Sequence, residues 1–165
     1  SFLEGASREG FLSAMNVSVY SYIAMAKRMV PLMAGHKASL LTLSYLGGEK
    51  VVPNYNTMGL CKAALESATR YIAADIGPQG TRANTLSCGP IKTLAASGIK
   101  GFSSMLAQCK AVSPSRSLVS IDEVGNTAAF LLSDYSLGIT AETIYIDGGF
   151  NALACCVDQA ASENA

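Results

Sequence analysis

A tyrosine and a lysine near the start of a long expected helix are the residues best suited to chemistry in this sequence. Tyr55 and Lys62 lie seven positions apart, close to two helical turns, so both side chains would point to one face about 10 Å apart along the axis. A nearby ammonium group favours the phenolate and lowers the pKa of a tyrosine. We therefore expect Lys62 to lower the pKa of Tyr55 and make it a proton donor near neutral pH. The spacing alone also fits a tyrosine packed on a loop and a solvated lysine.

A second tyrosine and a glycine-proline pair are expected close to Tyr55. Tyr45 follows one short apolar run, and Gly89-Pro90 follows another. Ligands bind outside the carboxyl ends of the strands in an open parallel sheet, so these segments should face one site. Ile91 could offer its backbone to a carboxamide and Thr93 its hydroxyl to a phosphate, although an ordinary strand-to-helix connection has the same pattern.

Helices and strands alternate along the expected order of elements. Apolar residues at three- and four-residue steps predict a helix over 9–33, ending around Pro31, and its few charges predict burial on nearly every side. Asn54 is the expected N-cap of a second helix, which stops at Gly77-Pro78. We expect strands at 38–44, 82–87 and 143–146, and further helices at 102–111 and 121–133. This alternation predicts an α/β fold with a parallel sheet, as a single domain over residues 1–165.

Composition argues against several classes of protein. The 165 residues include 12 Lys and Arg against 12 Asp and Glu, so no charge surplus favours nucleic acid or an anionic membrane as a partner. The longest uncharged run is too short and too polar to span a bilayer. The five cysteines form no C-x-x-C pair and His36 is the only histidine, which argues against a metal site and a disulfide framework and favours a reducing cytoplasm.

Two long stretches of the chain resemble the bacterial NADH-dependent enoyl-acyl-carrier-protein reductases, a divergent branch of the short-chain dehydrogenase/reductase superfamily. Residues 40–66 read LLTLSYLGGEKVVPNYNTMGLCKAALE and residues 70–100 read RYIAADIGPQGTRANTLSCGPIKTLAASGIK. Six residues separate Tyr55 from Lys62, and Tyr45 lies ten positions upstream of Tyr55. Ordinary short-chain dehydrogenases are similar, but they have only three residues between the corresponding tyrosine and lysine. The resemblance runs from about Arg8 to Asn151.

This resemblance implies reduction of the trans-2 double bond of an enoyl thioester on acyl-carrier protein with NADH, the last step of each fatty-acid elongation cycle. It implies that Tyr55 donates to the thioester oxygen, that Lys62 binds the nicotinamide ribose, and that Tyr45 lines the substrate pocket as a third catalytic residue. The implied cofactor-binding residues are Leu43, Lys62, Pro90, Ile91, Lys92, Thr93, Leu94 and Ala95. The implied substrate-binding residues are Tyr45, Tyr55, Met58, Ala95, Ile99, Phe102 and Met105.

The family resemblance also implies a Rossmann-like, doubly wound parallel sheet, of which about three strands are expected here. The family's first strand and glycine-rich turn precede the point that matches Ser1, so we expect the C-terminal part of a Rossmann-fold reductase without its N-terminal nucleotide-binding strands. We accordingly expect the intact enzyme, and not this piece alone, to bind NADH and be active. The sparsely charged helix at 9–33 and the Tyr55 helix predict a four-helix contact in a homotetramer. Two alternatives stay open: a ketoacyl or carbonyl reductase that uses Ser44, and an inactive oligomerising fragment.

Overall fold

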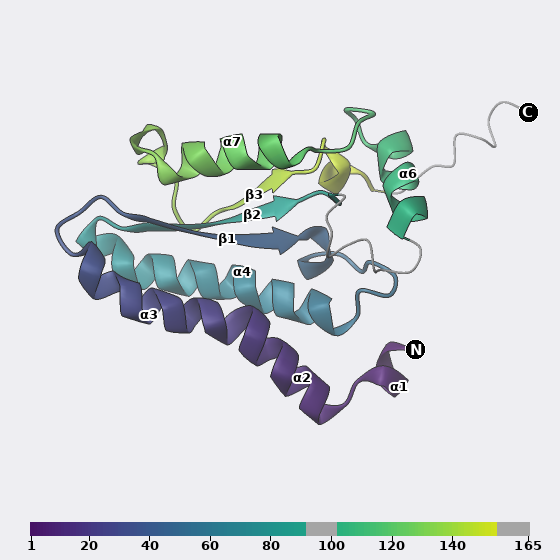
Figure 1. Ribbon diagram of the computed structural model, residues 1–165, viewed down its shortest axis with the longest axis horizontal. Helices are drawn as coiled ribbons and strands as arrows, with labels where there is room; N and C mark the ends of the chain where they lie inside the picture. The colour runs from purple at the N-terminus through teal and green to yellow at the C-terminus, as the bar shows by residue number, and fades with distance from the viewer. Residues whose placement is uncertain (92–101, 155–165) are drawn as a thin grey trace, which may run out of the picture.

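A three-stranded parallel sheet forms the middle layer of the molecule (Figure 1). The computed structural model describes residues 1–91 and 102–154. The strands β1 (Ser39–Tyr45), β2 (Arg82–Cys88) and β3 (Thr143–Ile146) are hydrogen-bonded in that order. Tyr45 pairs with Cys88, and Cys88 with Ile146, so all three strands end at one edge. The predicted strands and their parallel pairing are confirmed.

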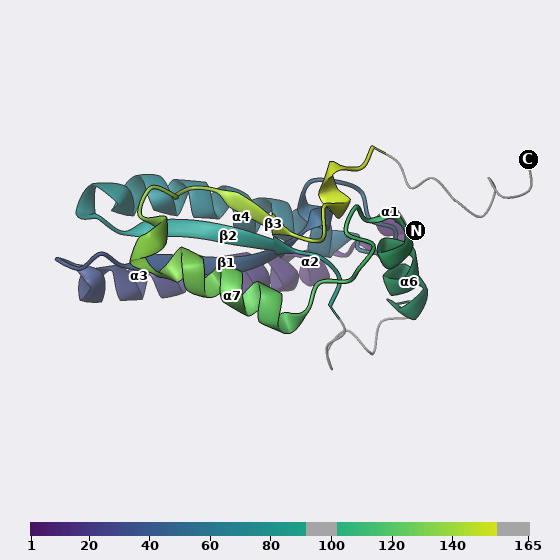
Figure 2. The same ribbon diagram turned by 90° about the horizontal axis from the view of Figure 1, so that it is seen from above.

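Helices cover both faces of this sheet (Figures 1 and 2). On one face lie α3 (Ser21–Met33) and α4 (Thr57–Ile76), and on the other lies α7 (Ile121–Leu132). The helix α6 (Phe102–Val112) stands beyond the carboxyl ends of the strands, and α1 (Phe2–Gly5) and α2 (Arg8–Met15) lead into α3. Within the described ranges, no helix combines the length and the apolar character that crossing a membrane requires.

The expected helix at 9–33 is divided in three and is buried along one stripe. A π-helical turn at Asn16–Tyr20 joins α2 to α3, which continues through Pro31 to Met33. Only one stripe, including Val19, Tyr22 and Ala26, is buried against α4 and the sheet. The sequence predicts burial against the sheet on one side and against another helix or a subunit on the other. The first contact is confirmed, and the remaining faces of the single chain expose Phe11, Leu12, Val17, Tyr20, Ile23, Met25, Met29 and Leu32.

The second long helix begins later than its sequence predicts. Asn56, not Asn54, is the N-cap of α4, and both asparagines have positive φ angles, of 47° and 65°. Asparagine tolerates this left-handed region better than most residues. Tyr55 therefore lies in a turn between them, where its carbonyl accepts a hydrogen bond from the Met58 amide at 3.1 Å. The expected stop at Gly77-Pro78 is confirmed, since α4 ends at Ile76.

A buried arginine at the start of β2 fastens α7 to the sheet. The Arg82 side chain is 5% exposed and donates to the carbonyl oxygens of Leu131 at 2.8 Å and Ser133 at 3.0 Å. These carbonyls lie at the C-terminus of α7, where the helix dipole favours a cation. Arg82 also donates to the Ser136 hydroxyl at 3.0 Å. The planar guanidinium thus satisfies several acceptors that would otherwise be buried without partners.

Arg82→Lys should lower the free energy of unfolding by about 2 to 4 kcal/mol, because a single ammonium cannot reach all of these acceptors. Urea denaturation followed by circular dichroism measures the change. Arg70→Lys, on an exposed position of α4, is the matched control and should stay within about 0.5 kcal/mol of the parent. Equal effects of the two changes would show that Arg82 does not fasten α7.

Candidate active site

A cleft of about 1040 Å³ opens where β1 and β2 end. Its walls come from the ends of the two strands, from the loop between β1 and α4, and from α6, which stands beyond the sheet edge (Figure 1). Tyr45, Tyr55, Lys62 and the Gly89-Pro90 pair all line it. The sequence prediction that these segments face one site at the carboxyl edge is consistent with this geometry.

Two tyrosine rings form the centre of this cleft. The ring centroids of Tyr45 and Tyr55 lie 4.9 Å apart with an interplanar angle of 68°, an edge-to-face contact. The Tyr45 hydroxyl donates to the Met105 sulfur on α6 at 3.8 Å. The Tyr55 hydroxyl has no hydrogen-bond partner among the described residues. It is therefore the phenol that can donate to a ligand in the cleft.

The expected effect of Lys62 on Tyr55 is wrong for the ligand-free chain. Burial, with smaller contributions from Tyr45 and Cys61, raises the pKa of Tyr55 to about 12. The Lys62 ammonium is directed instead to the Leu43 carbonyl, to which it donates at 2.9 Å. Tyr55 accordingly stays protonated at neutral pH, which is the form that a hydrogen-bond donor requires.

Lys62 is the cation that reaches into the cleft from α4. Burial lowers its pKa, and the neighbouring Cys88, Cys61 and Glu66 act in the opposite direction. Among the described residues, Leu43 is its only hydrogen-bond partner. An ammonium has three N–H groups, so Lys62 keeps donors for a ligand.

A glycine turn sets the position of the Tyr55 ring. Gly47 and Gly48 belong to a short 3-10 turn directly after β1, and a Cβ at Gly47 would collide with the Tyr55 ring. On the other side, a Cβ at Gly59 of α4 would lie 2.7 Å from the Gly47 carbonyl oxygen. The turn therefore fits between the ring and the helix only because these positions have no side chain.

The structure brings together most of the expected ligand-binding residues that it describes. Leu43, Pro90, Ile91, Phe102 and Met105 line the cleft with the two tyrosines and Lys62. Met58 does not line it, because this side chain packs on the core cluster beside Val19, Tyr22, Cys61 and Leu65. The expected residues Lys92, Thr93, Leu94, Ala95 and Ile99 lie outside the described residues.

Several residues of the cleft were not expected from the sequence. Cys88, Cys109 and Lys50 also line it. Cys88 could have been found, because it directly precedes Gly89-Pro90 at the end of a predicted strand. Cys109 and Lys50 carry no such signal, since each is placed by contacts between segments distant in sequence.

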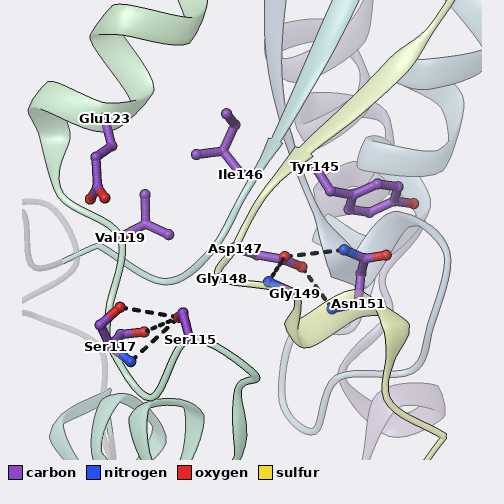
Figure 3. Close-up of a pocket in the computed structure, with 10 residues that line it drawn as sticks. All are labelled: Ser115, Ser117, Val119, Glu123, Tyr145, Ile146, Asp147, Gly148, Gly149 and Asn151. Carbon is purple, nitrogen blue, oxygen red and sulfur yellow. Dashed lines mark hydrogen bonds between the residues drawn. The ribbon is translucent and has the colours of Figure 1, made fainter.

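A smaller cavity of about 300 Å³ lies beside the end of β3 (Figure 3). The Asp147 carboxylate accepts the amides of Gly149 at 2.9 Å and Asn151 at 2.8 Å, and so closes the turn that follows β3. The Ser115 amide, in the loop after α6, donates to the Gly148 carbonyl at 3.1 Å. This contact fixes the C-terminal end of α6 to the sheet and thereby helps to place the α6 wall of the cleft.

Gly47→Ala should lower the free energy of unfolding by about 1 to 3 kcal/mol, because the added methyl must displace the Tyr55 ring or the turn. Urea denaturation measures the loss, and the ring proton shifts of Tyr55 report the displacement. Gly125→Ala, at a helical position with open space around it, is the control and should be neutral or stabilising. Unchanged stability and unchanged Tyr55 shifts in Gly47→Ala would contradict the proposed packing.

Comparison with solved structures shows that the fold is that of enoyl-acyl-carrier-protein reductases. The enoyl-[acyl-carrier-protein] reductase (NADH) of Aquifex aeolicus superposes with a TM-score of 0.88 at 48% identity, over 92% of this chain and 59% of that one. The Bacillus cereus enoyl-acyl carrier protein reductase gives a TM-score of 0.90 at 44% identity, over 94% of this chain and 60% of that one. The three strands and the helices that cover them thus form part of a Rossmann-like fold.

Sequence comparison gives the same family. The enoyl-[acyl-carrier-protein] reductase [NADH] FabI of Escherichia coli is 54% identical over 153 residues, which cover 93% of this chain and 58% of that protein. Its Bacillus subtilis counterpart is 48% identical over 90% of this chain and 57% of its own length. The chain spans less than two thirds of the length of these relatives. The family model described as "Enoyl-(Acyl carrier protein) reductase" matches residues 1–151, so the chain belongs to the enoyl-acyl-carrier-protein reductase family.

Proposed function

We propose that this protein reduces the trans-2 double bond of an enoyl thioester carried by acyl-carrier protein, with NADH, in the final step of the fatty-acid elongation cycle. The observation that carries the proposal is the convergence of Tyr45, Tyr55 and Lys62 on one cleft at the carboxyl edge of the sheet. The names of the relatives support it, since those from Escherichia coli and Bacillus subtilis are called NADH enoyl reductases.

Tyr55 is the proposed proton donor to the substrate. When bound, a reduced nicotinamide supplies the hydride that is transferred to the β-carbon of the thioester. The Tyr55 hydroxyl is protonated at neutral pH, as burial raises its pKa further above its ordinary value, to about 12, and it donates to the thioester oxygen on which negative charge develops. A donor aimed at charge that appears during the reaction stabilises the transition state more than the ground state.

The cleft also fits the cofactor. Lys62 has N–H groups free for the hydroxyls of a nicotinamide ribose. Leu43 is 53% exposed at the end of β1, and Pro90 and Ile91 line the same cleft. These apolar surfaces suit the flat nicotinamide ring. The Anaplasma phagocytophilum relative, 44% identical, was solved in complex with NAD, which agrees with this assignment.

The acyl chain has an apolar surface available on α6 and the β1 turn. Phe102, Met105 and Leu46 line this part of the cleft. The alternative carbonyl or ketoacyl reductase needs a free serine hydroxyl, but Ser44 is 5% exposed and its hydroxyl donates to the Glu66 carboxylate. The geometry therefore favours an enoyl substrate over a ketone.

Tyr55→Phe should lower turnover of crotonyl and longer enoyl thioesters by about two to four orders of magnitude, because it removes the proton donor and leaves the ring in place. Spectrophotometric NADH oxidation measures turnover, and fluorescence titration should show NADH binding unchanged. Tyr135→Phe, at an exposed position after α7, is the control and should leave turnover unchanged. Turnover of Tyr55→Phe within twofold of the parent would remove Tyr55 from this role.

We further propose a homotetramer in the bacterial cytoplasm. The exposed apolar side chains of the 11–32 segment, such as Val17, Met25 and Leu32, lie beside α4, which itself exposes Leu60 and Tyr71. A patch of apolar side chains on two adjacent helices is typical of an interface.

Size-exclusion chromatography with light scattering should give four times the mass of the chain. Val17→Glu together with Met25→Glu should shift the protein to smaller species, because each buries a charge in the proposed contact. Lys110→Glu, exposed on α6, is the control for an added acidic charge and should not change the mass. A stable monomer of the parent protein would contradict the assembly.

A further inference from the structure

We propose that Glu66 is a positioning residue for Lys62 and for the carboxyl end of β1. The inference deepens the proposed function and rests on it, because it concerns the residue proposed to hold the nicotinamide ribose. Glu66 lies one helical turn after Lys62 on α4, so both side chains point towards β1.

Lys62 and Glu66 hold consecutive residues of the strand. The Lys62 ammonium donates to the Leu43 carbonyl at 2.9 Å, and the Ser44 hydroxyl donates to the Glu66 carboxylate. Ser44 is 5% exposed, so its hydroxyl would be buried without a partner if Glu66 could not accept. Two residues four apart on a helix therefore clamp two adjacent residues of β1, and Tyr45 is the next residue along the strand.

Glu66 also contacts the turn that supports Tyr55. A Cβ at Gly48 would lie 3.0 Å from the Glu66 Oε1 atom and 3.0 Å from the Lys62 carbonyl carbon. The Gly48 backbone thus rests directly against this part of α4. The carboxylate borders the strand end, the glycine turn and the lysine, which are the three parts that shape the reactive end of the cleft.

Glu66 acts on Lys62 through its charge, in addition to accepting the hydrogen bond from Ser44. The titratable groups that influence Lys62 in the described part of the chain are Cys61 and Glu66 on α4 and Cys88 on β2. Burial lowers the pKa of Lys62, and all three groups oppose that change. Glu66 is the one carboxylic acid among them, whereas the other two are thiols. It therefore supports the ammonium form that a ribose hydroxyl would accept from.

Glu66→Gln separates the charge from the hydrogen bond. Glutamine keeps a side-chain oxygen that can accept from Ser44, but it carries no charge. The pKa of Lys62 should fall, so more of it is free amine at a given pH. We expect trace acetylation of Lys62 at about pH 9 to be about threefold faster or more in Glu66→Gln. Peptide mass spectrometry measures the rate, with the exposed Lys37 as an internal reference.

Ser44→Ala is the matched control, because it removes the hydrogen bond and keeps the charge. Its Lys62 labelling rate should remain within about twofold of the parent, since the carboxylate still favours the ammonium. Glu66→Asp, which also keeps the charge, should label more slowly than Glu66→Gln. Equal Lys62 labelling in the parent, Ser44→Ala and a folded Glu66→Gln would overturn the proposal.

If Glu66→Gln does not fold, Glu66→Asp decides the question. The shorter side chain keeps the charge but draws the carboxylate away from Ser44 and Lys62, so labelling of Lys62 relative to Lys37 should still rise above that of the parent. A ratio that does not change would overturn the proposal. Because labelling needs neither cofactor nor substrate, these outcomes are distinct from a failure of the proposed function, which would appear as unchanged turnover in Tyr55→Phe.

Discussion

The junction between β1 and α4 is the contact on which the rest of the site depends. Lys62 and Glu66, one helical turn apart, hold Leu43 and Ser44, which are neighbours on the strand. Hydrogen bonds that involve a charged group contribute more than neutral ones, about 1.5 to 3 kcal/mol each. The junction also requires close backbone approach, because Gly48 has no room for a side chain against the helix. A shift of the helix along the strand would break all of these contacts together.

This junction gives the two reactive side chains different electrostatic states. Tyr55 lies in the turn before α4, against another tyrosine ring, and burial raises the pKa of its hydroxyl to about 12, so the group is protonated and neutral at neutral pH. Lys62 lies one turn into the helix, where its ammonium reaches the Leu43 carbonyl and the cleft. A neutral donor and a cation are thus placed at one edge of the sheet without an ion pair between them. This pairing of a neutral phenol with a separate ammonium group suits a reaction in which the phenol donates to developing charge and the ammonium holds a cofactor.

Patterns local in sequence predicted the elements of the fold well. The strands were predicted from apolar runs and most helix ends from helix-stop residues such as Gly77-Pro78, and both are confirmed. Predictions that depended on three-dimensional packing were less successful. The start of α4 was misplaced because Asn56 takes a left-handed conformation, and Lys62 was expected to act on Tyr55 because both were assigned to one helix. The role of Arg82 as a clamp could not be read from sequence, since its acceptors lie about 50 residues away along the chain.

The central claim is that Tyr55 and Lys62 serve one bound nicotinamide. The most direct measurement is a nuclear Overhauser experiment on the intact enzyme with NADH, read between the nicotinamide protons and the ring protons of Tyr55. NADH should bind saturably with a contact to Tyr55, and Lys62→Ala should show a marked loss of that binding. NADH that binds away from Tyr55, or that binds equally well to Lys62→Ala, would contradict it.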